Sequence, residues 1–408
     1  MRLNGVWRRS AEELPSGGLR VLDQRRLPFE VLDISLETES DCARAIRSME
    51  VRGAPLIGIV AAYGLVFALQ EDPSDGNLEG AFHRLMETRP TAVNLAWALR
   101  AVRTSVQTAP LSERAGGARA TARILADADA AACEAIGRHG LALFRELHAR
   151  ANGARSVLGN ADAPKASAGR GRNTRRISTR PSDDLGRFRV SQHPPRPLQI
   201  LTHCNAGWLA TVDWGTALAP IYMAHDAGIP VHVWVDETRP RNQGLLTAFE
   251  LRSHGVPCTF IADNAGGHLM QRGEVDVCIV GCDRVTRRGD ACNKIGTYLK
   301  ALAAQAHGVP FYVAMPWSTY DSKLVDGVRE IPIEDRSGDE VRAVSGLDDR
   351  GLMATVHLVP PGQAVQNPAF DVTPAALVAG FITERGIFAA ADLAAEGERL
   401  EEPDGRSG

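Results

Sequence analysis

The second half of the chain alternates short apolar runs with helix-like segments, and this alternation constrains the fold most. Stretches such as WGTALAPIYMAHDAG and GLLTAFELRSHG separate β-rich runs that are bounded by Gly, Pro or polar residues. These runs are LQILTHC, PVHVWVDE, CTFIAD, VDVCIVGCD and PFYVAM. Strands that alternate with helices form βαβ units with right-handed crossovers and a parallel sheet. We therefore expect an α/β domain over residues 197–395, with a parallel sheet flanked by helices.

The first part of the chain predicts a different architecture. Residues 1–152 contain DCARAIRSM, LIGIVAAYGLVFAL and AWALRAVRTSV, in which apolar residues recur at three- and four-residue spacing. This spacing is typical of amphipathic or buried helices. Before them, GLRVLDQRRLPFEVLDI alternates apolar and polar positions, as short strands joined by a turn do. We expect a mainly helical domain with a short β element.

A basic segment separates these two parts. Residues 153–196 are rich in Gly, Ser and Pro and carry ten Lys or Arg against three Asp. Such a segment buries too little apolar surface to offset the entropy of ordering, so we expect a disordered insert. The alternative is a basic arm for nucleic acid or another acidic partner. The segment lacks interleaved aromatic residues, which favours the linker. Residues 396–408 are predicted to be a flexible tail.

Composition excludes several classes of protein. Lys plus Arg number 46 against 49 Asp plus Glu, and aromatic residues make up 5%. This balance argues against nucleic-acid binding driven by charge or by base stacking. No apolar signal region opens the chain and no apolar stretch reaches about 20 residues, so no membrane partner is expected. The seven scattered cysteines form no C-x-x-C pair, which indicates reduced thiols in the cytoplasm and no metal site.

Polar residues follow the predicted strands. Ligands of such sheets bind at the carboxyl ends of the strands. Here those ends carry His203-Cys204-Asn205, Asp236-Glu237-Thr238, Asp263-Asn264 and Asp283-Arg284. This pattern predicts a small polar substrate.

Two of these strand ends could carry chemistry. Cys204 would have a lowered pKa if it lay near a helix N-terminus, but it could equally be a buried structural cysteine. Strand alternation would point His203 to the opposite face, as a hydrogen-bonded residue. At Asp283, partial burial would raise the pKa toward the range useful for proton transfer. The alternatives are a helix cap or a salt bridge to Arg284, and Asp236 and Asp263 occupy equivalent positions.

Phosphate binding needs a separate source, because neither a Walker motif nor G-x-G-x-x-G is present. In VRGAPLIG, the Arg52 side chain and the amides of Gly53 and Ala54 could hold an anion at the start of a helix. Arg89 in TRPTAVN and the pair Asn293-Lys294 before IGTYLKAL offer similar chemistry. Together they indicate a phosphorylated substrate.

These motifs resemble the methylthioribose-1-phosphate isomerase family, within the superfamily of the alpha, beta and delta subunits of eukaryotic translation initiation factor 2B. The resemblance implies a helical N-terminal domain, a Rossmann-like C-terminal domain without dinucleotide, a homodimer and a place in methionine salvage. The matching stretches are LDQRRLP, RGAPLIGIVAAYG, RPTAVNL, ILTHCNAG, VDETRPRNQG, GCDRV with GDACNKIGTY, IPIEDRS and NPAFDVTP.

The resemblance also implies roles for individual residues. It makes Cys204 and Asp283 the catalytic pair. The substrate contacts that it implies are Arg52, Gly53, Ala54, Arg89, Gln243, Asn293 and Lys294.

The chain departs from the family pattern at several positions. It reads GCDRV where GADRI is usual, and Arg288 replaces an Asn before Gly289-Asp290. In MPWSTYD, the bulky Met315 and Trp317 are expected to reshape the pocket near the sugar's 5-substituent. The insert has no recognised counterpart.

The resulting prediction is an aldose–ketose isomerase acting on 5-methylthioribose 1-phosphate, without cofactor or metal. One alternative keeps the enzyme and changes the sugar to 5-deoxyribose 1-phosphate or ribose 1,5-bisphosphate. The bisphosphate needs a second anion site, which the apolar Met315-Pro316-Trp317 run argues against. The alternative of another class is a non-catalytic regulatory subunit. Whether hydrogen moves from C2 to C1 as a proton or as a hydride stays open.

Overall fold

The computed structural model describes residues 1–3, 5–89, 92–158 and 195–401. Most of the predicted insert, 159–194, therefore lies outside the described residues. Its first residues, 153–158, form the end of a long helix, α5. The predicted tail over 396–408 begins inside the last helix, α12 (Ala390–Glu401), and residues 402–408 lie outside the description.

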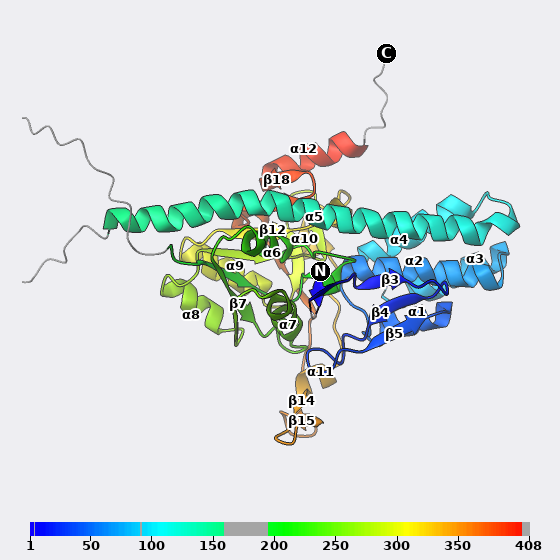
Figure 1. Cartoon of the computed structure of the whole chain (residues 1–408), viewed down its shortest axis with the longest axis horizontal. Helices are drawn as coiled ribbons and strands as arrows, with labels where there is room; N and C mark the ends of the chain where they lie inside the picture. Colours follow the sequence, from blue (N-terminus) through cyan, green and yellow to red (C-terminus); the bar gives the residue numbers. More distant parts are fainter. Residues whose placement is uncertain (4, 90–91, 159–194, 402–408) are drawn as a thin grey trace, which may run out of the picture.

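The first part of the described chain is a cluster of helices, seen at the right of Figure 1. At its centre α2 is apolar on all sides because it is surrounded: 78% of its 18 residues are buried. It is the one described helix long and apolar enough to cross a membrane, and its burial is that of a core helix. The helices are α1 (Glu39–Arg47), α2 (Ala54–Glu71), α3 (Asp75–Met86), α4 (Val93–Val106) and α5 (Leu111–Leu158).

Short strands precede these helices, as the alternating pattern predicts. β3, β4 and β5 form an antiparallel sheet, and a two-residue pair opens the chain. Their bounds are β1 (Arg2–Leu3), β2 (Val6–Trp7), β3 (Ala11–Glu13), β4 (Leu19–Leu22) and β5 (Asp33–Leu36).

Helix α5 joins the two halves of the molecule. It has 48 residues and runs across the whole width of the view in Figure 1. Its first half packs against α2 and α4, and its second half against α6 and β17. Gly140 allows this approach, because a Cβ there would lie 2.4 Å from Pro220 of α6. The helical cluster and the sheet therefore both pack against the same helix, α5.

The second part is a seven-stranded sheet, parallel except for its last pair, which confirms the predicted α/β class. Buried side chains pack on both faces of this sheet. In spatial order the strands are β18 (Gly386–Phe388), β17 (Gly380–Thr383), β12 (Phe311–Ala314), β9 (Val277–Val280), β6 (Leu198–Thr202), β7 (Val231–Asp236) and β8 (Cys258–Ile261). The helices among them are α6 (Ala219–Asp226), α7 (Gly244–His254), α8 (Ala265–Gln271) and α9 (Thr297–Ala306).

The strand order reverses between β6 and β9. The chain passes from β6 to β7 and β8 on one side and then returns to β9 on the other. Such a switch point opens a crevice at the carboxyl ends of the two strands, where ligands of open α/β sheets bind.

A smaller sheet and a hairpin complete the fold. The hairpin of β14 and β15 projects from the body at the bottom of Figure 1. The small sheet has the order β13 (Tyr320–Asp321), β10 (Arg284–Thr286), β11 (Ala291–Lys294) and β16 (Phe370–Thr373). The remaining elements are η1 (Trp208–Ala210), η2 (Trp317–Thr319), α10 (Gly327–Glu330), α11 (Asp339–Arg342), β14 (Ala343–Leu347), β15 (Met353–His357) and η3 (Ala375–Leu377).

Candidate functional site

One pocket at the switch point collects every residue predicted for the site. It lies between the start of α2 and the carboxyl ends of β6 and β9, and its cavity volume is about 90 Å³. The predicted residues that line it are Arg52, Gly53, Ala54, Arg89, Cys204, Gln243, Asp283, Asn293 and Lys294. The structure thus brings together groups that lie far apart in the sequence, while their roles stay predictions.

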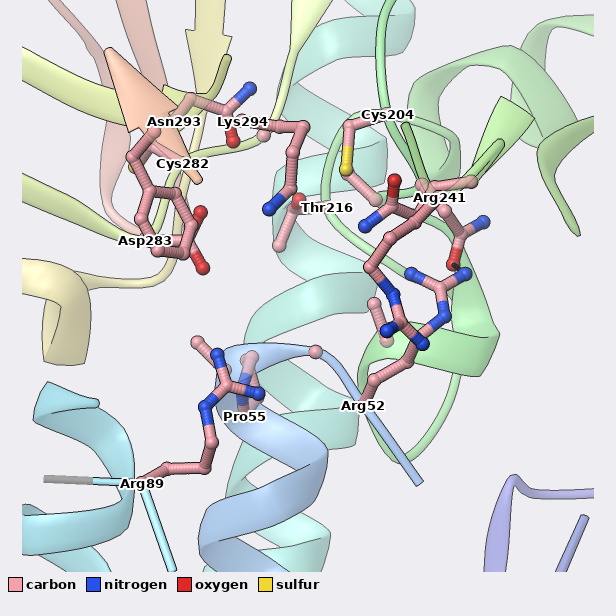
Figure 2. Close-up of a pocket in the computed structure, with 18 of the residues that line it drawn as sticks. Arg52, Pro55, Arg89, Cys204, Thr216, Arg241, Cys282, Asp283, Asn293 and Lys294 are labelled. Carbon is pink, nitrogen blue, oxygen red and sulfur yellow. Dashed lines mark hydrogen bonds between the residues drawn. The ribbon is translucent and has the colours of Figure 1, made fainter. Parts of the chain in front are cut away.

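Cys204 and Asp283 lie on opposite sides of this pocket, with Lys294 between them (Figure 2). Cys204 follows β6 and Asp283 follows β9, the two strands that flank the switch point. The pocket therefore places a thiol and a carboxyl group on either side of a bound molecule.

The Cys204 backbone adopts a left-handed conformation, with φ of 70°. A non-glycine residue holds this conformation at an energetic cost, and such residues cluster at functional sites. The Cys204 N–H donates to Thr238 Oγ1 at 2.8 Å, and its carbonyl accepts from Thr247 Oγ1 at 2.8 Å. Two hydroxyl groups thus fix the peptide that carries the thiol.

The condition for a lowered Cys204 pKa, a helix that begins directly after it, is not met. The segment after Cys204 forms the short turn η1 rather than an α-helix. Burial raises the pKa of Cys204, although the charges of Lys294 and Arg52 act in the opposite direction. The raised pKa favours the protonated thiol.

The Asp283 carboxyl is available for proton transfer. Burial raises its pKa, as predicted, against the opposing charges of Lys294 and Arg89. The alternative of a salt bridge to Arg284 is not realised, because the Arg284 guanidinium lies 3.8 Å from Asp321. Among the described residues, Asp283 has no ion-pair partner within 4 Å.

Lys294 is held at the end of β11. Its Nζ donates to the Ala369 carbonyl at 3.0 Å and lies 4.2 Å from the centre of the Phe370 ring. Burial lowers its pKa. The pair Asn293-Lys294 belongs to this strand, whereas helix α9 begins only at Thr297. The two side chains therefore reach the pocket from a strand rather than from a helix N-terminus.

Arg52 enters the pocket from the loop before α2. This loop packs so closely on η1 that a Cβ at Gly53 would lie 2.3 Å from the Ala210 carbonyl oxygen, and Gly53 has φ of 98°. Only glycine fits there. Arg52 is buried, and burial lowers its pKa to about 10. Its guanidinium donates to Asn205 Oδ1 at 3.4 Å, and no described carboxylate lies within 4 Å of it.

The other arginines of the pocket are paired with glutamates. Arg89 lies 3.6 Å from Glu334, and Arg241 lies 2.6 Å from Glu340. Arg336 lies 2.8 Å from each of these glutamates. These ion pairs run in the order Arg89, Glu334, Arg336, Glu340 and Arg241. They connect the helical cluster to the loop before α7.

The prediction of site residues missed several groups that line this pocket. Arg241 lies in VDETRPRNQG and Arg336 in IPIEDRS, two of the matching stretches, and their positive charge is the signal that could have marked them for an anion site. The predicted Gln243 directly precedes α7, and among the described residues its buried Oε1 has no hydrogen-bond partner. The other residues of the lining that were not predicted are Met49, Pro55, Asn205, Ala206, Ala210, Thr216, Gly281, Cys282, Pro316 and Phe370.

The other polar strand ends lie outside the pocket. His203 points away from it, as alternation predicts, with Nδ1 2.9 Å from Asp236 and Nε2 2.8 Å from the Ile295 carbonyl. Asp263 accepts from backbone N–H groups. The potential ligand atoms of His203, Asp236 and Asp263 lie within 4.8 Å of one another, but the Lys300 ammonium lies 3.2 Å from Asp236. This cluster is a buried ion-pair network that already contains its cation.

The expected effect of Met315 and Trp317 on the pocket is wrong. Met315 is fully buried in the core beside the sheet. Trp317 packs its ring on Tyr320 and Phe388. Of this run only Pro316 reaches the pocket lining. The bulky side chains follow β12 into the core because the chain turns there into η2.

A small apolar cavity extends the pocket beside Asp283. It has a volume of about 60 Å³ and shares Asp283 and Arg89 with the pocket. Its apolar lining comprises Ala54, Ile57, Ala92, Ile331, Pro332 and Phe370, and Arg284 also borders it. One end of a bound molecule would thus meet hydrocarbon together with the charged groups at the edge of the cavity.

Comparisons with known proteins agree with this architecture. The family model of the Initiation factor 2 subunit family matches residues 50–162 and 192–390. The methylthioribose-1-phosphate isomerase of Methylorubrum populi is 52% identical over 96% of both chains.

Two solved structures share the whole fold. The 5-methylthioribose 1-phosphate isomerase of Pyrococcus horikoshii superposes with a TM-score of 0.73 at 34% identity, covering 97% of this chain and 96% of that one. Subunit delta of translation initiation factor 2B from A. fulgidus gives a TM-score of 0.71 at 30% identity, with 97% and 100% covered. The chain therefore belongs to the Initiation factor 2 subunit family, beside its methylthioribose-1-phosphate isomerases.

Proposed function

We propose that this protein is an aldose–ketose isomerase that converts 5-methylthioribose 1-phosphate to 5-methylthioribulose 1-phosphate in methionine salvage. The names of its curated relatives, similar over nearly the whole chain, support the reaction. The observation that carries the mechanism is that Cys204 and Asp283 lie on opposite sides of one pocket, beside Arg52, which has no carboxylate within 4 Å among the described residues.

The substrate sets a specific chemical task. Its C1 oxygen is phosphorylated, so the ring cannot open spontaneously to a free aldehyde. The enzyme must open the ring and then move a hydrogen from C2 to C1, with no net change in atoms or electrons. Asp283, whose pKa burial raises, is placed to exchange a proton with the ring oxygen or the C2 hydroxyl. From the other side, Cys204 acts at C1 and C2, either as an acid or base or by stabilising the transition state.

Arg52 is the proposed phosphate ligand. It is a buried cation without a carboxylate partner among the described residues, and a phosphate would satisfy its charge with paired hydrogen bonds. The backbone of Gly53 and Ala54 at the start of α2 adds donors of the kind that anions bind. The remaining predicted contacts, Gln243 and the pair Asn293-Lys294, would orient the sugar hydroxyls.

The apolar cavity supports a methylthio group at C5. Ile57, Ile331 and Phe370 offer hydrocarbon contact to it. A second phosphate there would have to compete with carboxylates, because Arg89 is paired with Glu334 and Arg284 with Asp321. The geometry therefore favours the methylthio sugar, and then 5-deoxyribose 1-phosphate, over ribose 1,5-bisphosphate.

Substitution of the two proposed catalytic residues tests the reaction. Cys204→Ser and Asp283→Asn should each lower kcat on 5-methylthioribose 1-phosphate by at least 10³-fold while the thermal unfolding midpoint changes little. Cys258→Ser on β8 and Asp263→Asn, both outside the pocket lining, are matched controls. Near-normal turnover by either folded variant would remove that residue from the mechanism.

The choice of sugar is tested by comparing kcat/KM for the three candidates. The methylthio sugar should rank first and the bisphosphate last. A higher value for the bisphosphate would refute the preference. Absence of turnover on every sugar 1-phosphate, together with tight protein partners, would instead support the non-catalytic regulatory subunit.

We further propose that the protein acts as a homodimer in the cytoplasm. All seven cysteines are free thiols, which suits a reducing compartment. Directly after the pocket strand β11, helix α9 exposes Tyr298, Leu299 and Leu302, with Leu299 65% exposed. A second copy that covered these side chains would bury them. Light scattering should give twice the chain mass, and Leu299→Asp should shift it toward the monomer.

A further inference from the structure

Glu250 is a buried carboxylate that no part of the proposed mechanism uses. It lies on α7 with 0% of its surface exposed. Its oxygens accept from the N–H groups of Trp208 and Leu209 at 2.8 and 3.3 Å, from the Tyr222 hydroxyl at 2.9 Å and from Asn205 Nδ2 at 2.8 Å. Among the described residues no cation lies within 4 Å of it. Donors therefore surround this carboxylate, and none of them is a full positive charge.

The hydrogen bonds of Asn205 fix which way its amide points. Its Nδ2 donates to Glu250 at 2.8 Å and to Thr247 Oγ1 at 3.1 Å. The Thr247 hydroxyl gives its own proton to the Cys204 carbonyl, so toward Asn205 it can only accept. Burial raises the pKa of Glu250 to about 7, so above that pH its carboxylate is ionised and can likewise only accept. Both partners thus require the amino group, and Oδ1 must face the Arg52 guanidinium, which it meets at 3.4 Å.

We propose that Asn205 and Glu250 are positioning residues that hold Arg52 in the pocket and free of a carboxylate for the phosphate group. The neutral amide of Asn205 separates the buried cation from the buried anion, while its dipole links the two. Direct pairing, as between Arg241 and Glu340, would force the phosphate to displace a carboxylate. The identity of the anion as a sugar phosphate rests on the proposed function.

The same helix face holds the thiol and the loop that carries Arg52. Thr247 and Glu250 lie three residues apart on α7 and therefore on one face. Glu250 packs so closely on Gly207 that a Cβ there would lie 1.9 Å from Oε2. By fixing the start of η1, Glu250 also supports Ala210, on which Gly53 rests. The face of α7 that carries Thr247 and Glu250 thus sets the relative positions of Cys204 and Arg52.

The test compares two substitutions of Asn205. Asn205→Asp keeps the shape of the side chain but places a carboxylate oxygen against Arg52, whereas Asn205→Ala removes the side chain and adds no charge. Binding of inorganic phosphate is measured by calorimetry at pH 8, together with KM and kcat on 5-methylthioribose 1-phosphate. We expect Asn205→Asp to weaken phosphate binding and raise KM by at least tenfold. Asn205→Ala loses the contact with Arg52 but adds no carboxylate, so it should change both by a smaller factor, about threefold to fivefold.

This order is the reverse of what a purely structural role would give, since aspartate resembles asparagine more than alanine does. Equal effects of the two substitutions, or a larger effect of alanine on phosphate binding, would overturn the proposal. Phosphate binding needs no turnover. A wild-type protein that bound phosphate without isomerising the sugar would therefore refute the proposed function and leave the positioning proposal testable.

Glu250→Gln provides a second variant in case Asn205→Asp does not fold. It removes the anion without bringing a carboxylate to Arg52. We expect kcat to fall at least tenfold, because the Asn205 and η1 donors lose an acceptor, and phosphate affinity to fall by a smaller factor, because no carboxylate reaches Arg52. A kcat and a phosphate affinity that both stayed within twofold of wild type would contradict the proposal.

Discussion

The pocket holds its arginines by two different means. Arg52 rests on close backbone packing of Gly53 and on one amide oxygen, and no described carboxylate balances it directly. Arg89 and Arg241 are instead held by glutamates that bridge them through Arg336. A cation without a partner attracts an anionic ligand, whereas a paired one mainly shapes the wall. Under the proposed function, the difference explains why a pocket with four arginines would bind a single phosphate group.

The strongest test of this comparison removes one arginine of each kind, first Arg52 and then one that is paired with a glutamate. Arg52→Ala should lower kcat/KM by about 10³-fold, since loss of a buried charged contact costs on the order of 4 kcal/mol. Arg241→Ala is the matched variant and should cost about tenfold or less, because Arg336 still pairs with Glu340. Steady-state kinetics measures both. Equal losses would show that the paired arginine binds the phosphate as strongly.

A smaller effect is expected when the backbone packing beneath Arg52 is disturbed. Gly53→Ala should lower kcat/KM by about 10²-fold, because the new Cβ would meet Ala210 at 2.3 Å and the loop must shift. Gly76→Ala is the control, since its Cβ would meet nothing within 4 Å. If Gly53→Ala retained full activity, the rigid placement of Arg52 would be refuted.

Release of a paired arginine should move the substrate preference. Glu334→Gln leaves Arg89 without its glutamate beside the apolar cavity. The ratio of kcat/KM for ribose 1,5-bisphosphate to that for the methylthio sugar should rise about tenfold, equivalent to about 1.4 kcal/mol. Glu340→Gln should change this ratio less, because Arg241 does not line that cavity. An unchanged ratio in Glu334→Gln would remove the ion pair from the explanation of specificity.

The ion pairs of Glu340 with Arg241 and Arg336 should also make the stability of the fold sensitive to acid. Hydrogen bonds and charges from Arg336 and Arg241 outweigh burial and lower the pKa of Glu340 to about 2, from an ordinary value of 4.5. A lowered carboxyl pKa stabilises the fold fully above about pH 4.5, and that stabilisation is lost as pH falls toward 2. The difference in unfolding midpoint between wild type and Glu340→Gln should therefore shrink from pH 6 to pH 3. A constant difference over that range would contradict the pairing.

The smallest effect on activity is expected from a change far from these arginines, in residues 159–194. The N–H of Arg196 donates to Asn152 Oδ1 at 2.9 Å, and the Arg196 carbonyl lies 3.1 Å from His148 Nε2, so the flanks of residues 159–194 are held together. Replacing 159–194 by a short Gly-Ser linker should change kcat and KM by less than twofold, since closure entropy varies slowly with loop length. A tenfold rise in KM would support the alternative that the arginines of this segment reach the substrate.

The sequence anticipated the parts of the site that depend on strand ends. Residues that follow parallel strands meet at one edge, so the polar strand ends were expected together, and the resemblance then selected Cys204 and Asp283 among them. Alternation likewise predicted that His203 would face away from the pocket. Only the resemblance to the family predicted Gln243 as a substrate contact, because no local sequence pattern indicates a role for it.

What the tertiary structure decided concerns contacts between segments distant in sequence. The bridging of Arg89 and Arg241 through Glu334 and Glu340, and the amide between Arg52 and Glu250, join residues many positions apart. The pKa of Cys204 is raised rather than lowered because burial, a property of the assembled fold, outweighs the local turn. Periodicity reports which face of an element is apolar. Charge balance and desolvation depend on which elements then meet, and only the folded chain brings those elements together.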